Sequence, residues 1–139
     1  MQLSILSPEK RIATAIEVAS VTLPGSEGQI QVLPEHADMI GTIETGTFAY
    51  VPVSGSPVVG VMTSGFFEVR HGAITVAAET CELATDIDAT RAKTAQNKAE
   101  GALKDPELNP DLFRKYELKL QRALIRQQVA GKEFSSLDH

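Results

Sequence analysis

Up to about residue 85, apolar and polar positions alternate over short stretches that turn residues separate. The clearest alternation runs from residue 12 to residue 21, where Ile12, Ile16 and Val18 fall on one face. No intervening segment is long enough for the helical crossover that parallel strands need, so the pattern predicts an antiparallel sandwich or barrel. The expected strands, each bounded by Gly, Pro or Ser, are 2–7, 12–21, 29–33, 39–43, 48–53, 57–62, 66–70 and 74–78.

After residue 85 the apolar period changes to three and four residues, which is typical of helices. Thr85 or Asp86 can cap a first helix, and a break at residues 105–110 ends it. Asn109 followed by Pro110 predicts the start of a second helix, which Gly131 can stop. We therefore expect an α+β, mainly β, fold. An N-terminal antiparallel β-sandwich (1–85) precedes a C-terminal antiparallel two-helix hairpin (86–131) and a tail (132–139).

The first helix carries an apolar stripe that is almost entirely alanine, facing a row of Leu, Phe and Tyr on the second. Such a pairing buries little area, worth only a few kcal/mol at about 25 cal/mol per Å². Isolated helices of this length are themselves marginal in water. Two alternatives follow: a permanently packed hairpin, or an arm that leaves its domain at modest cost.

Composition places the chain among ordinary soluble proteins, with 42% hydrophobic and 22% charged residues in 139. No run approaches the roughly 20 apolar residues of a membrane span, and the first residues do not resemble a signal peptide. A single cysteine, Cys81, excludes an internal disulfide framework. These features predict a cytoplasmic protein that can still dock on a membrane complex.

The net charge of −5 is unevenly distributed along the chain. Residues 1–85 hold nine acidic and three basic side chains, for a net of −6, whereas residues 112–139 carry a net of +3. An acidic body argues against nucleic-acid binding, which requires a basic docking face. The basic end indicates instead an acidic protein partner.

Three segments resemble the ATP synthase epsilon subunit family, in the family's order and spacing. They are PGSEGQIQVLPEHA at residues 24–37, SGFFEV with ITVAAE at residues 64–69 and 74–79, and DIDATRA at residues 86–92. The resemblance runs from the first strand to about Gly131 and implies a ten-stranded sandwich followed by two helices. It also implies a non-catalytic rotor subunit of a bacterial F-type, proton-translocating ATP synthase.

The resemblance further implies a set of partners: the gamma subunit, the c-ring and the alpha/beta catalytic hexamer. The sandwich would sit at the foot of the central stalk, with the loop of Glu35 and His36 facing the c-ring. The family often carries an acidic residue near that loop where this chain has Gln29. The expected location is peripheral, on the cytoplasmic side of the bacterial inner (plasma) membrane, without insertion into the bilayer.

In the family the helices either lie folded on the sandwich or extend beside gamma and block ATP hydrolysis. Two arrangements that differ by only a few kcal/mol fit the weakly packed hairpin described above. The basic side of the second helix would meet an acidic segment of the beta subunits. Its members are Arg114, Lys115, Lys119, Arg122 and Arg126.

The sequence contains none of the common catalytic motifs. G-x-x-x-x-G-K-[ST], G-x-S-x-G and H-E-x-x-H are all missing, and His36 has no identifiable nucleophile or metal partner. We therefore expect an accessory subunit rather than an enzyme, with no catalytic residues, no metal site and no required cofactor.

ATP as a regulatory ligand is the sharpest hypothesis that the resemblance suggests. Some bacterial relatives use an Ile/Leu-Asp-x-x-Arg-Ala motif, matched here by Ile87, Asp88 and Arg91, together with arginines on the second helix. Arg122 and Arg126 lie four residues apart, on one helical face, and three guanidiniums could converge on phosphates. Glu82 and Asp88 would receive the adenine amine or ribose, and Lys98 replaces a further arginine, which predicts weakened affinity.

Simpler roles for the same residues stay open. Asp88 can cap a helix, and Arg122 and Arg126 can form salt bridges on the surface or with a partner. Two other functions compete with the rotor subunit: a free ATP-sensing module, and a β-sandwich adaptor that uses the hairpin as a generic docking arm.

Overall fold

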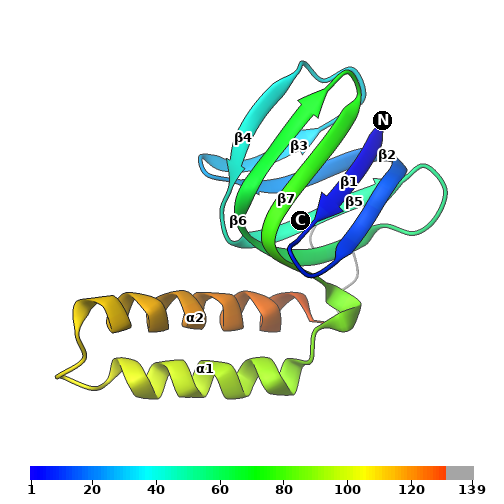
Figure 1. Ribbon diagram of the computed structural model, residues 1–139. Coiled ribbons are helices and arrows are strands. Elements are labelled where there is room, and N and C mark those ends of the chain that lie inside the picture. The colour runs from blue at the N-terminus through cyan, green and yellow to red at the C-terminus, as the bar shows by residue number, and fades with distance from the viewer. Residues whose placement is uncertain (131–139) are drawn as a thin grey trace.

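The structure is a computed structural model that describes residues 1–130, in which seven strands are followed by a short 3-10 helix, η1, and two α-helices (Figure 1). The expected tail at 132–139 and the helix stop at Gly131 lie outside the described residues. The predicted order of a β-sandwich followed by a helical hairpin is confirmed. The elements are β1 (Gln2–Leu6), β2 (Arg11–Gly25), β3 (Gly28–Val32), β4 (Met39–Ile43), β5 (Gly46–Pro52), β6 (Val58–Arg70), β7 (Ala73–Leu83), η1 (Ala84–Asp86), α1 (Ala89–Leu103) and α2 (Pro110–Val129).

The strands pair in the order β1-β7-β6-β4-β2-β3, with β5 bonded to β2 and β6 and with β1 also bonded to β2. This sheet folds back on itself, so few backbone edges stay unpaired. Within residues 1–130 we find seven strands rather than the ten that the resemblance implied, because β2, β6 and β7 run for 15, 13 and 11 residues without a break. The pairing of β1 with β7 is parallel and departs from the antiparallel prediction. It arises because β1 lies between β2 and β7 and is antiparallel to β2 alone.

The main hydrophobic core lies inside the sandwich and takes every buried member from the strands. Phe48 and Tyr50 of β5 stack with ring centroids 6.5 Å apart, and Phe67 of β6 is fully buried. No described helical residue belongs to this core. The sandwich therefore has the apolar interior it needs to fold without the hairpin.

Strand β6 changes the side that it presents to the core near its middle. Met62 and Phe67 are both fully buried in the same core although their positions are five apart, an odd spacing that would place them on opposite faces of a regular strand. Gly65 lies between them, where an added Cβ would come 2.0 Å from the Ala77 carbonyl oxygen. The Ser64-Gly65 pair therefore bends one long strand and does not separate two, as the sequence had suggested.

A bulge interrupts the pairing of β1 with β2. The register shifts between Leu3 and Ile5, and Ala15 opposite them has a φ of 47°, a conformation that L residues rarely adopt. The Ala15 N–H donates to Ser4 Oγ at 3.0 Å. The local strain is thus partly offset by a hydrogen bond.

Side-chain caps begin both helices. Asp88 accepts a hydrogen bond from the Arg91 backbone N–H at 3.1 Å and caps α1. The cap expected at Thr85 or Asp86 was wrong, because those residues belong to η1. Asn109 accepts from the Leu112 N–H at 2.9 Å with Pro110 next in the helix, as predicted for α2.

The hairpin touches the sandwich through a small second cluster at its base. Val129 of α2 is fully buried against the outer faces of β5 and β6 and against η1, with Ile87 and Ile125 partly buried beside it. From there the two antiparallel helices project away from the sandwich (Figure 1). Their mutual contact is thin, because only Ala92 and Ala99 of α1 are buried. The sandwich members of this cluster are Ala49, Val59, Val61 and Ala84.

Candidate functional site

A cavity of about 630 Å³ lies between the two helices and the adjoining ends of β6 and β7. Most of its apolar lining consists of small side chains, because α1 presents its alanine stripe to the cavity. Its polar part is mostly cationic. The lining residues are Val61, Thr63, Thr80, Glu82, Ala95, Lys98, Ala99, Ala102, Tyr116, Lys119, Arg122, Ala123 and Arg126.

Four cations and one carboxylate face this cavity, which gives it a net positive charge. Arg126 donates to Glu82 in an ion pair that joins α2 to β7. Arg122 Nε is buried and lacks a hydrogen-bond partner among the described residues. The Lys119 ammonium lies 5.5 Å from the centre of the Tyr116 ring. An unpartnered buried guanidinium nitrogen is unfavourable, so an anionic ligand would be stabilised there.

A hydroxyl pair forms part of the sandwich wall of the cavity. The Thr63 and Thr80 hydroxyl oxygens are 2.7 Å apart, and Thr63 Oγ1 also accepts from the Thr80 N–H at 3.1 Å. Thr63 is buried although it is polar, and these bonds satisfy it. The wall thus offers a rigid polar patch beside the apolar floor.

A second cavity of about 470 Å³ lies on the other side of the Glu82–Arg126 pair, beside the β1–β2 turn. It is lined by residues of that turn, such as Lys10, and by the end of β7. Cys81 borders it, and burial raises the pKa of the Cys81 thiol to about 12. The thiol therefore stays protonated at neutral pH, which disfavours a nucleophilic role.

The structure brings together three of the residues predicted to bind nucleotide: Glu82, Arg122 and Arg126 all line the larger cavity. Ile87 packs instead in the cluster at the hairpin base, and Asp88 caps α1. Arg91 lies one helical turn before the lining residue Ala95, with an exposed side chain that does not line the cavity.

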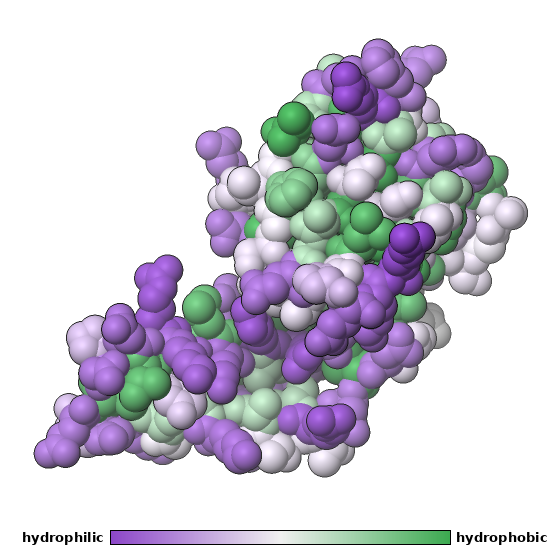
Figure 2. Space-filling model, viewed as in Figure 1, coloured by the Kyte–Doolittle hydropathy of each residue, from purple (hydrophilic) through white to green (hydrophobic). Residues whose placement is uncertain are grey.

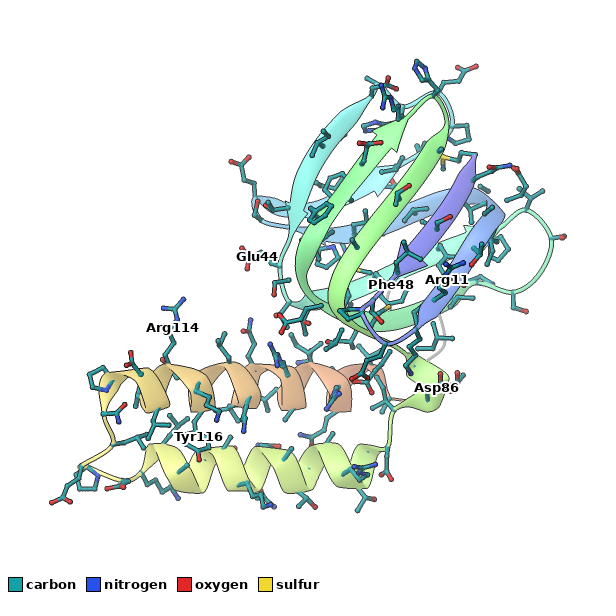
Figure 3. All side chains as sticks on the ribbon, viewed as in Figure 1. Arg11, Glu44, Phe48, Asp86, Arg114 and Tyr116 are labelled. Atoms are coloured by element: carbon teal, nitrogen blue, oxygen red, sulfur yellow. The ribbon has the colours of Figure 1, made fainter. Side chains whose placement is uncertain are left out.

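The residues predicted to meet partners fall in two distant places. Glu35 and His36 lie in the loop between β3 and β4, at the end of the sandwich away from the hairpin (Figure 1). Glu35 has a positive φ of 68°, and His36 Nδ1 lies 2.7 Å from the Ala37 carbonyl oxygen. Both exposed cations Arg114 and Lys115 lie on α2, where Arg114 points away from α1 (Figure 3).

Sequence reasoning missed several cavity residues and assigned Lys119 only to a partner surface. Tyr116 points between the helices (Figure 3), and together with Lys119 and Ala123 it continues the face of Arg122 and Arg126. The three- and four-residue spacing of these positions was a usable signal. The inward-facing Thr63 and Thr80 had no signal, because their orientation depends on the bend in β6.

Within residues 1–130, no group of three or more His, Cys, Asp or Glu side chains is arranged to hold a metal ion. In that same range, neither helix combines the length and apolarity that crossing a bilayer requires.

Known sequences and structures similar to this chain agree with one another. A curated ATP synthase epsilon chain of Geotalea daltonii is 41% identical over 134 residues, which cover 95% of this chain and 94% of that one. That of Geobacter sulfurreducens is 39% identical over 132 residues, with the same coverage. Among solved structures, a chain of the Euglena gracilis mitochondrial ATP synthase (OSCP/F1/c-ring) superimposes with a TM-score of 0.82. The superposition covers 92% of this chain and 79% of that one at 19% sequence identity, so the two chains share a fold.

The family models divide the chain as the structure does. The beta-sandwich domain of the ATP synthase delta/epsilon chain matches residues 1–84, and the long alpha-helix domain of the same family matches residues 85–131. With both domains matched in order and relatives about two-fifths identical along nearly the whole length, the chain belongs to the ATP synthase delta/epsilon chain family.

Proposed function

We propose that the chain is a non-catalytic central-stalk subunit of a proton-translocating ATP synthase. It couples the catalytic head to the c-ring and restrains ATP hydrolysis through α1 and α2. The observation that carries this proposal is the division of the molecule into a sandwich with its own core and a hairpin held by one small cluster. Family membership and the names of the relatives support it.

The two ends of the molecule suit two different partners. The loop of Glu35 and His36 lies at one end of the sandwich and would face the c-ring, while the hairpin projects from the other end. The gamma subunit would hold the sandwich between them, and the alpha/beta hexamer would receive the helices. The protein would act on the cytoplasmic side of the bacterial plasma membrane, peripheral to the bilayer.

Inhibition requires that the hairpin leave its place on the sandwich. Besides the Val129 cluster, the described polar link between α2 and the strands is the Glu82–Arg126 ion pair, whose side chains are 26% and 39% exposed. A partly exposed pair is screened by solvent and adds little stability. Release would carry the cations of α2, among them the already exposed Arg114 and Lys115, to an acidic surface on the beta subunits.

We further propose ATP as a regulatory ligand of the 630 Å³ cavity. The unpartnered Arg122 Nε, with Arg126 and Lys119 nearby, would hold phosphate oxygens. Arg91, which lies one turn before Ala95 and outside the cavity, would have to turn inward to join them. Because the ligand would bridge both helices and β7, its binding would favour the folded hairpin.

Calorimetric titration with ATP and ADP tests the ligand. We expect saturable ATP binding, weakened about 10- to 100-fold by Arg122→Gln because a charge-assisted hydrogen bond is lost. Arg114→Gln removes an exposed arginine outside the cavity and should leave binding unchanged. Equal effects of the two substitutions would show that the cavity is not the site.

Co-purification tests the rotor assignment itself. A tagged chain expressed in its own organism should bring down the gamma subunit together with the alpha/beta hexamer. Tight ATP binding without any such complex would favour the free ATP-sensing module. Capture of unrelated proteins alone would favour the generic adaptor.

A further inference from the structure

The turn between β1 and β2 (residues 7–10) lies beside the ion pair that joins the hairpin to the sandwich. Strand β1 runs parallel to β7 as far as Leu6, which is paired with Ala77, so the turn that follows lies along the last residues of β7. In Figure 1 this turn reaches the end of β7 that continues into η1. Lys10, the last residue of the turn, lines the cavity of about 470 Å³ together with Glu82 and Arg126.

Backbone hydrogen bonds hold Lys10 in this place. The Ser7 N–H donates to the Lys10 carbonyl oxygen at 2.9 Å, and the Lys10 N–H donates to Ser7 Oγ at 3.3 Å. The Ser7 hydroxyl also donates to the Lys10 carbonyl oxygen at 3.1 Å. None of these bonds uses the lysine side chain. The turn therefore fixes the base of a flexible aliphatic stem beside the cavity and leaves its ammonium free to move.

The Lys10 ammonium lies close to a carboxylate that already has another partner. No ion pair among residues 1–130 includes Lys10, whereas Glu82 is paired with Arg126. Lys10 and Glu82 line the same cavity. Both charges also act on the Cys81 thiol: burial is the main cause of its raised pKa, the Lys10 ammonium lowers that pKa, and the Glu82 carboxylate raises it. Lys10 is thus a spare cation next to Glu82.

The cavity becomes more negative when the hairpin leaves. Three carboxylates line it, those of Glu9, Glu79 and Glu82, against the two cations of Lys10 and Arg126. Arg126 belongs to α2 and leaves with the hairpin, whereas the other four groups stay on the sandwich. Hydrophilic side chains gather on the visible face where the hairpin meets the sandwich (Figure 2). In the released state Lys10 is the one lining cation that remains near Glu82.

We propose that Lys10 is the alternative partner of Glu82: its ammonium takes the place of the Arg126 guanidinium when the hairpin is released. The inference rests on the proposed release of the hairpin and adds a sandwich residue that sets how readily release occurs. In the docked state Lys10 and Arg126 compete for one carboxylate and repel each other. In the released state Lys10 alone compensates Glu82. Both effects favour release, so Lys10 opposes docking.

The expected effect is modest, because the groups involved reach solvent. Lys10 is exposed, and the Glu82 side chain is 26% exposed even while it is paired with Arg126. An ion pair of this exposure changes an equilibrium by about 1.5- to 5-fold. Lys10 therefore tunes the balance between docked and released hairpin and does not decide it alone.

Hydrogen exchange of the full-length chain tests the proposal. Lys10→Gln removes the charge but keeps the backbone hydrogen bonds of the turn, and release should become rarer. Amides of α1 and α2 should then exchange about threefold more slowly than in the wild type, while amides of β6 and β7 stay unchanged. Arg11→Gln is the matched control, because Arg11 is the next residue, is exposed and does not line the cavity. It should leave the exchange of the helices unchanged.

A second pair of variants tests the partner. In a chain that carries Glu82→Gln, the slowing caused by Lys10→Gln should shrink from about threefold to less than about 1.5-fold. The carboxylate for which Lys10 competes is then missing, and what is left of the effect is the screened repulsion between Lys10 and Arg126. Thermal unfolding should show that every variant folds.

Each outcome decides a different point. Helix amides that exchange in Lys10→Gln at the wild-type rate or faster would overturn the proposal, since Lys10 would then not oppose docking. A slowing that is kept in full beside Glu82→Gln would overturn the pairing with Glu82. Wild-type helices that exchange only together with the strands, at the rate of global unfolding, would overturn the proposed release of the hairpin, and this inference with it.

Discussion

Replacing Val129 with alanine should release the hairpin while leaving the sandwich folded. Among the α2 residues in the cluster at the hairpin base, Val129 is the one that is fully buried. The main core contains no described helical residue. The substitution therefore weakens the joint between the two parts and neither part itself.

The expected size follows from the atoms removed. Val129→Ala deletes two buried methyl groups, worth about 0.8 kcal/mol each in transfer free energy. A cavity of a few tens of Å³ adds up to about 1 kcal/mol, less where the hairpin can settle into it. The total is about 2 kcal/mol, which shifts the balance between docked and released hairpin about 30-fold.

Hydrogen exchange resolves this shift by region. Released helices of this length are marginal, so amides throughout α1 and α2 should exchange about 30-fold faster in the variant. Amides of β6 and β7 should be unchanged. Leu124→Ala is the control, because Leu124 lies on the same helix but is 41% exposed.

Two results would refute this reasoning. If strands and helices exchanged faster together, hairpin and sandwich would form one cooperative unit. If the helices were unaffected, the docking energy would lie elsewhere, and the small cluster could not be the hinge of a two-state arm.

Three further predictions concern the sandwich. Ala15→Gly should raise the free energy of unfolding by about 0.5 kcal/mol in denaturant titration. The strain that glycine relieves at this positive φ exceeds the extra entropy that it gives the unfolded chain. A lower free energy of unfolding would mean that the bulge is unstrained. Gly65→Ala should cost at least about 3 kcal/mol, because backbone atoms block the new Cβ, and a melting temperature like the wild type's would contradict the bend. Stability should fall as pH rises from 9.0 towards 12, because the unfolded Cys81 thiol ionises while the buried one keeps its proton. Denaturant titrations at several pH values should show that the free energy of unfolding falls less steeply with pH in Cys81→Ala than in the wild type. Identical slopes would rule out this thiol as the cause.

The sequence predicted the fold class because apolar alternation and the later helical period are local signals. The prediction of strand boundaries was weaker where a glycine or proline, which usually separates two strands, lies within one long strand. Ser64-Gly65 suggested a turn, yet the glycine permits close approach inside β6. Likewise Pro24 and Gly25 lie between the expected strands 12–21 and 29–33, yet they end β2 and pair with Gln29 and Gly28 of β3.

The candidate site was predictable only in part. The four-residue spacing of Arg122 and Arg126 placed both on one face, and the structure sets that face on the cavity with Glu82. Arg91 was expected to join them because it is level with the end of α2. Its side chain is exposed outside the cavity, and sequence spacing cannot specify how far a side chain turns inward at a helix end.

The measurement that tests the central claim most directly is ATP hydrolysis by a catalytic hexamer with its gamma shaft but without this subunit. The full chain is added to one sample and a chain ending at Thr85, which keeps the whole sandwich core, to another. We predict that both bind and that only the full chain slows hydrolysis. Equal slowing by the two would contradict inhibition through the helices, and failure of both to bind would contradict the place of this chain in the rotor.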